Sequence, residues 1–139
     1  MKSRMRSLLR SGFVLGAVFS MAHVHGHHST TMFDSSNPIE LSGTVVDWQF
    51  ENPHVFIILA VEDAAGDTVV WDLEGPNVNG LTRSGWTPKT LQPGDELVVT
   101  VNPLHSGAPG GSYRNVRWAV DGSPVDPRAG RPASAEPSP

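Results

Sequence analysis

Residues 39–50, in which apolar and polar side chains alternate, limit the possible fold of this chain more than any other segment. Their apolar side chains occupy every second position up to Val45, then shift by one position at Val46 and continue in the new phase to Phe50. A β-bulge produces such a change, because one inserted residue turns every later side chain to the opposite face of the strand. The pattern predicts a long, strongly curled first strand that serves both sides of a small barrel.

Four shorter strands and one short helix are expected after it. The second strand is an unbroken apolar run rich in β-branched and aromatic residues, which predicts burial on both of its faces. Pro76 can begin the helix, and Gly85 can end it in the left-handed conformation. The later strands are expected over residues 54–62, 68–73, 96–101 and 113–120, with a glycine-rich loop over 103–112.

This order of elements is typical of a five-stranded OB-like β-barrel, an all-β fold with one short helix that uses its loops for ligands. An immunoglobulin-like sandwich would need about seven strands and fits less well. We therefore predict one OB-like domain over residues 39–122. Within it, Val69, Trp71 and Leu73 share one face of the third strand, as expected for a strand with one side toward the core.

The amino terminus has the three parts of a secretory signal. Four basic residues precede a twelve-residue apolar stretch, Ser11 to Ala22, and small residues follow at positions that suit cleavage. The stretch is too short to span a bilayer, which takes about 20 apolar residues. We expect a signal peptide over residues 1–22, with cleavage after Ala22 or as late as Gly26. The mature protein would then be periplasmic, without stable membrane insertion.

The mature chain is acidic and contains no cysteine. Without residues 1–22, lysine and arginine number 6 against 14 acidic residues, a net charge of about −8. Nucleic acids and anionic membranes are therefore poor partners. Disulfides, thiol catalysis and thiolate metal sites are excluded. The chain also lacks the Gly-x-Ser-x-Gly motif of a serine nucleophile, and no other catalytic motif predicts an enzyme. Residues 123–139 are rich in proline, alanine and serine and are predicted to be disordered.

Most of the histidines follow the predicted signal peptide directly: His23, His25, His27 and His28. A free amino-terminal histidine can bind Cu(II) or Zn(II) through its amine and ring nitrogen, and imidazole also suits nickel. Cleavage after Ala22 would place His25 third, where it can complete a square-planar site. Cleavage after Gly26 would expose His27 and His28, with His54 as the third partner. The alternative is a flexible tail with only adventitious metal affinity, in which case His54 is a hydrogen-bonded residue at a strand end.

A metal-free interaction module is the second hypothesis. OB-type barrels bind peptides or saccharides on exposed aromatic residues and loops, and Trp86 and Trp118 lie beside polar loop residues. The partner would be a periplasmic protein or a small ligand. Core filling is the alternative account of these rings. Asp72 and Glu74 occupy alternate positions of one strand. They are either paired carboxyl groups for catalysis or part of a solvated strand face. His105, in the glycine-rich loop, is expected to be solvated.

A set of short motifs is distributed along the chain: His27-His28-Ser29, Phe33-Asp34, Leu41-x-Gly43-Thr44-Val45, Asn52-Pro53-His54, Trp71, Pro76-Asn77, Gly85-Trp86, Leu91-x-Pro93-Gly94-Asp95, Pro103-Leu104 and Gly110-Gly111. Together they resemble an uncharacterised family of small exported proteobacterial proteins, a domain of unknown function. The resemblance covers about His27 to Gly122 and implies export followed by one compact β domain. Family members usually carry alanine where this chain has Gly26, which leaves the cleavage position open.

Overall fold

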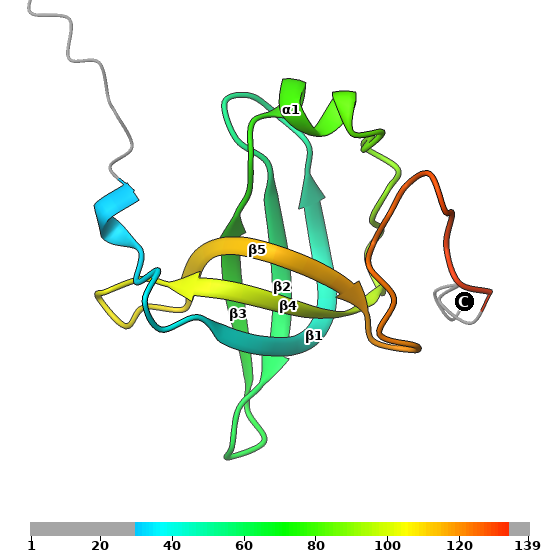
Figure 1. The fold of residues 1–139 in the computed structure, drawn as a ribbon. Coiled ribbons are helices and arrows are strands. Elements are labelled where there is room, and N and C mark those ends of the chain that lie inside the picture. The colour runs from blue at the N-terminus through cyan, green and yellow to red at the C-terminus, as the bar shows by residue number, and fades with distance from the viewer. Residues whose placement is uncertain (1–29, 134–139) are drawn as a thin grey trace, which may run out of the picture.

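The structure, a computed structural model, describes residues 30–133 and consists mainly of β-strands (Figure 1). Its elements are η1 (Thr30–Met32), β1 (Ile39–Gln49), β2 (Phe56–Glu62), β3 (Thr68–Glu74), α1 (Val78–Arg83), β4 (Glu96–Pro103) and β5 (Gly110–Trp118). The strands form a closed barrel in the order β1-β2-β3-β5-β4. The prediction of a five-stranded, OB-like barrel with one short helix is confirmed.

Strand β1 connects the two sides of the barrel, as its sequence pattern predicts. Residues 39–44 pair with β4, and residues 43–49 pair with β2. The pairing with β2 shifts register between Val45 and Asp47, so the bulge lies where the apolar phase changes. Figure 1 shows the strand bending from one side of the barrel to the other. The bulge turns Val45 inward and leaves Val46, 48% exposed, on the outside.

Strand β2 differs from its prediction in one respect. Ile57 and Leu59 are fully buried in the barrel, but Phe56 and Ile58 point outward and are only half-buried. Within residues 30–133, no second sheet covers this outward side, and Met32 of η1 borders only the hollow beside Phe56. The apolar composition that predicts burial on both faces therefore leaves an apolar strip on the outside of the barrel.

Two glycines close the barrel where the sequence predicts only a loop. Gly110 and Gly111 pair in parallel with Asp72 and Leu73 of β3. A Cβ atom on Gly111 would lie 2.4 Å from a Val101 methyl carbon, far inside van der Waals contact. Only glycine lets β5 come this close to its neighbours, and its weak strand propensity explains why the sequence alone indicates a loop.

Helix α1 is capped at both ends by the residues around the predicted boundaries. The Asn77 side chain accepts a hydrogen bond from the Gly80 N–H at 2.8 Å, so the helix begins after Asn77 rather than at Pro76. Gly85 has a φ of 94°, and the Trp86 N–H donates to the Leu81 carbonyl at 3.0 Å. This Schellman arrangement ends the helix.

Residues 123–133, the C-terminal strap, lie on the barrel, whereas composition predicts disorder from residue 123. The Val125 N–H donates to the Val116 carbonyl at 2.9 Å, so the strap hydrogen-bonds to the edge of β5. The Val125 side chain joins the core, and Arg131 pairs with buried Asp95. These two side chains anchor the strap to the barrel. The average composition of the segment, which is polar and rich in proline, does not reveal them.

Candidate functional site

The outward side chains of β1, β2 and β3 form a continuous surface, which we call the outer face. Its central column is the apolar strip of β2, with more polar columns on β1 and β3. Val46 and Val70, each 48% exposed, extend the apolar area. The register places the outward residues in two rows across the strands: Gln49–Phe56–Glu74 and Asp47–Ile58–Asp72.

Two adjoining hollows occupy the outer face, with Phe56 and Asp72 lining both. The first, of about 580 Å³, lies over β1 and β2 and also includes Val46 and Ile58. The second, of about 420 Å³, lies between β3 and the loop that joins β4 to β5. It is lined by Met32, Phe33, Phe56, Val70, Asp72, Glu74, Leu104 and residues 108–111. An apolar floor with carboxylates on either side can bind an extended, amphipathic ligand.

His54 lies at the β1–β2 loop end of this surface. Its Nδ1 atom is 2.9 Å from Oε1 of Glu74 and 3.1 Å from the Gly75 carbonyl oxygen. When Nδ1 carries a hydrogen, it donates to these acceptors and fixes the ring. Metal-binding histidines are commonly oriented in this way by a carboxylate or carbonyl, and they then bind the metal through Nε2.

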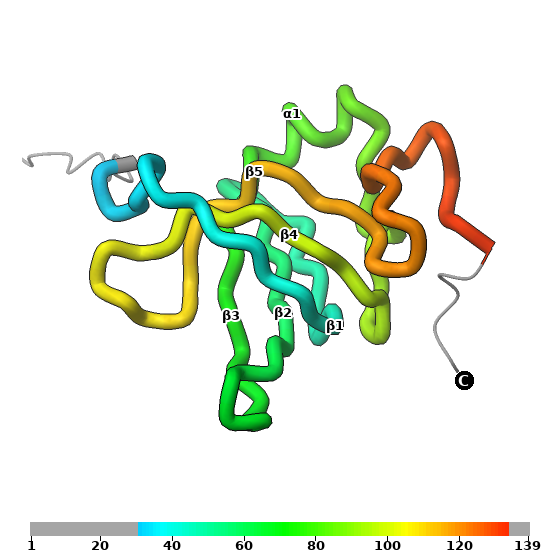
Figure 2. Tube along the Cα trace, turned by 60° about the horizontal axis from the view of Figure 1, so that its bottom comes forward, coloured from blue at the N-terminus to red at the C-terminus, as the bar shows by residue number. Residues whose placement is uncertain are grey.

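The segment before β1 and the β4–β5 loop lie side by side, as Figure 2 shows, and both line the second hollow. The His105 N–H donates to the Met32 carbonyl at 3.0 Å, and the Asp34 N–H donates to the Pro103 carbonyl at 2.8 Å. A hydrogen bond from the Asn37 side chain lowers the pKa of Asp34. The chain that follows the histidine cluster is thus attached beside the outer face. The His105 side chain is exposed.

The histidines predicted to form the amino-terminal site, His23, His25, His27 and His28, lie outside the described residues. Within residues 30–133, no group of three or more histidine, aspartate or glutamate side chains is placed to hold a metal ion. Among the described residues, His54 contacts the carboxylate of Glu74. The same residues include no helix with the length and hydrophobicity to cross a membrane.

The two tryptophans predicted as ligand platforms lie away from the outer face. Trp118 is 2% exposed, and the Arg131 guanidinium lies 4.8 Å from its ring centroid. Trp86 is half-buried, with its ring centroid 5.7 Å from that of Trp48. Both rings mainly serve packing, so the aromatic group that the outer face offers is Phe56.

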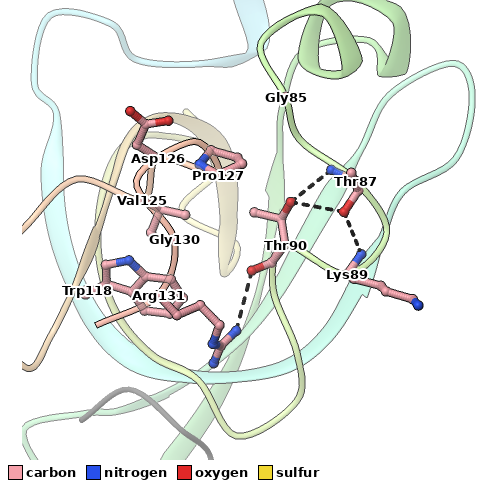
Figure 3. Close-up of a pocket in the computed structure, with 10 residues that line it drawn as sticks. All are labelled: Gly85, Thr87, Lys89, Thr90, Trp118, Val125, Asp126, Pro127, Gly130 and Arg131. Carbon is pink, nitrogen blue, oxygen red and sulfur yellow. Dashed lines mark hydrogen bonds between the residues drawn. The ribbon is translucent and has the colours of Figure 1, made fainter. Parts of the chain in front are cut away.

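A third hollow, of about 220 Å³, lies between the strap and the segment after α1. Figure 3 shows Trp118 and Arg131 side by side on one wall, with Thr90 opposite and the Lys89 amine directed away. The Trp118 Nε1–H has no hydrogen-bond partner within the described chain. The buried hydroxyl of Tyr113, a half-buried residue, also lacks a partner there, and burial raises its pKa.

The sequence indicates part of the outer face but not its centre. The alternation along the third strand predicts Asp72 and Glu74 on one face, and they lie there. The apolar run of the second strand predicts Phe56 and Ile58 in the interior, because such a run does not reveal whether a second layer covers it. The exposed side of β2 follows only from the closure of the barrel.

The barrel and its outer face define a small OB-like β-barrel protein with an apolar, acid-flanked surface. The chain belongs to DUF6152, a family of unknown function, which matches residues 15–114. No curated protein and no solved structure matches the chain significantly. The match includes the histidine cluster and most of the barrel, and it ends before the strap.

Proposed function

We propose that this protein is a binding module that takes its ligand on the outer face. The observation that carries the proposal is the uncovered apolar strip, Phe56 with Ile58, between two hollows that share Phe56 and Asp72. OB-type barrels bind ligands on the same face, formed by strands 2 and 3 with the β1–β2 and β4–β5 loops. Here His54 stands at the first loop, and Leu104 lies at the second.

The apolar strip is unusual for a surface that serves only solubility. Val46 and Val70 are each 48% exposed, next to half-buried Phe56 and Ile58. Contiguous exposed apolar area rimmed by polar groups marks interaction sites in soluble proteins. Burying such side chains in a complex gains roughly 25 cal/mol for each Å² removed from water.

A displayed random-peptide library tests the proposal without assuming the partner. Wild-type protein should enrich peptides whose binding is lost in Phe56→Ser and Ile58→Ser. The matched control is Val98→Ser, which changes a half-buried valine on β4, and it should bind the peptides like wild type. Enrichment of peptides that bind all four proteins equally would place any binding elsewhere. Circular dichroism should first verify that each variant is folded.

The second candidate function is transition-metal binding at the edge of the same surface. His54 with Nδ1 toward Glu74 at 2.9 Å favours it, because that geometry suits a ligand held through Nε2. Met32 and Glu74 line the same hollow. The chain from His28 to Met32 can reach at most about 14 Å when extended. In this proposal His27 and His28, exposed by export to the periplasm, complete a copper or zinc site.

Metal titration of protein purified after export tests this candidate. Intact mass should first establish the mature terminus. If the chain starts at His27, Glu74→Gln should weaken Cu(II) affinity by about 10- to 100-fold, because it removes the partner that orients His54. His54→Ala removes a direct ligand and should weaken the affinity more, while His105→Ala should have no effect. Saturable binding that ignores His54→Ala but is lost when one residue is added to the terminus would indicate the His23-Val24-His25 start. Weak, nonsaturating Cu(II) binding by every variant would mean that the histidines form a flexible tail with only adventitious metal affinity.

A further inference from the structure

We infer that the partner of the outer face is a basic, extended polypeptide segment that adds to the open edge of β3. This inference rests on the proposed function and names the chemistry of its ligand. Two observations carry it: the distribution of charge on the outer face and the unpaired part of β3.

Carboxylates flank the apolar strip on both sides. Asp47 and Asp72 stand opposite Ile58 in the same row of the sheet. Adjacent strands are about 4.8 Å apart, so the two backbones lie roughly 10 Å from each other across Ile58. Within residues 30–133, neither carboxylate forms an ion pair. A lysine or arginine side chain laid across the strip can bury its stem on Ile58 and place its charge at a carboxylate.

Phe56 adds a second feature suited to cations. Its ring lies between both hollows, with Glu74 directly opposite in the pairing of β2 and β3. The face of an aromatic ring attracts a cation placed over it. A carboxylate beside such a ring strengthens the preference for positive charge.

The edge of β3 explains why the ligand should be an extended chain. All of β3 pairs with β2, but only Asp72, Leu73 and Glu74 pair with β5. Residues 68–71 therefore have one unpartnered edge in the barrel. Such an edge can hydrogen-bond an added strand. Every second side chain of that strand would lie beside Val70 and Asp72, which line the second hollow.

Charge argues against the other occupants of this surface. Residues 30–133 contain 6 lysines and arginines against 13 acidic residues. A second copy of the chain would bring like charge to the carboxylates, and a nucleic acid would bring its phosphates. A basic segment alone matches both the apolar strip and its acidic borders.

Fluorescence anisotropy with three labelled peptides tests the inference. The first alternates lysine and valine, the second alternates glutamate and valine, and the third is the lysine peptide with N-methylated valines that cannot donate hydrogen bonds. Wild-type protein should bind the first and neither of the others. Asp72→Asn should weaken binding about two- to fivefold. Asp47→Asn should weaken it less, because β1 lies about 14 Å from a strand added to β3, and the double variant should lose more than either. Glu96→Gln, an equal charge change at an exposed residue of β4, should leave the affinity unchanged.

The outcomes separate this inference from the proposed function. Equal binding of the lysine and glutamate peptides, or no loss in the double variant, overturns the basic partner. Undiminished binding of the N-methylated peptide overturns strand addition. If displayed peptides that require Phe56 prove neutral or acidic, the module stands and the inference fails. If no peptide depends on Phe56, both fail.

Discussion

Arg131 of the strap makes a bidentate ion pair with Asp95, the turn residue before β4. Arg131 Nη1 donates to Asp95 Oδ2 at 3.0 Å, and Nη2 donates to Oδ1. The Asp95 side chain is buried and also accepts the Gln92 N–H at 2.8 Å. The same guanidinium stacks on the Trp118 ring. One residue near the carboxyl end thus neutralises a buried carboxylate and covers a core tryptophan.

Replacing Arg131 should destabilise the fold strongly. Arg131→Ala leaves the buried Asp95 carboxylate without its counter-charge, and loss of one partner of a buried pair costs about 3 to 5 kcal/mol. Urea unfolding followed by tryptophan fluorescence measures the change. Arg128→Ala, in the same strap but exposed, should cost about 0.5 kcal/mol or less. Equal midpoints for the two variants would show that the pair contributes nothing.

Tyr113 should make the fold sensitive to alkali. Burial raises the pKa of its hydroxyl, whereas the unfolded chain ionises at its ordinary pKa of about 10. Stability from this residue is therefore complete below about pH 10 and falls as pH rises further, because only the unfolded state loses the proton. Tyr113 is the single tyrosine of the chain, so near-ultraviolet tyrosinate absorbance reports it alone. That absorbance should appear only as the protein unfolds.

The Tyr113→Phe variant provides the control for this prediction. Because the buried hydroxyl has no partner within the described residues, its removal should leave stability unchanged or raise it by about 1 kcal/mol at neutral pH. The variant should also lose less stability than wild type above pH 10. A tyrosinate signal at the ordinary pKa in folded protein would contradict the burial of the hydroxyl.

Two glycine-to-alanine changes should act in opposite directions. Gly111→Ala puts a Cβ atom 2.4 Å from Val101 and 2.5 Å from the Asn102 carbonyl oxygen, so it should cost about 1 to 3 kcal/mol. Gly80→Ala adds a methyl group 3.5 Å from its nearest neighbour, inside a helix, and should gain about 0.5 to 1 kcal/mol. Thermal unfolding compares them. A stable Gly111→Ala protein would mean that β5 need not approach β4 so closely.

The two tryptophans on β3 and β5 should differ in their contribution to the core. Trp118 is 2% exposed, so Trp118→Ala should cost about 3 to 5 kcal/mol. Trp71 is half-buried and packs at the side of the core, so Trp71→Ala should cost clearly less. Chemical denaturation of the two variants gives the order. The reverse order would mean that the Trp71 ring fills more of the barrel than its exposure indicates.

Local sequence signals determined the order of elements and several of their details. The phase change at Val46 predicts the bulge because side chains alternate strictly along a strand. Gly85 predicts the end of α1 because glycine, unlike other residues, adopts the left-handed conformation there with almost no steric cost. Both signals depend on neighbouring residues alone, which is why they can be recognised without a structure.

Tertiary structure decided what covers each surface. The apolar run of β2 is compatible with one or two packed layers, and only the closed barrel shows that Phe56 and Ile58 face outward. Gly110 and Gly111 are strand residues because β3 and β4 approach them, a contact between segments far apart in sequence. Arg131 is an anchor because Asp95, 36 residues earlier, is buried beneath it. Such long-range contacts leave no local periodicity, so composition alone predicted a loop and a disordered tail.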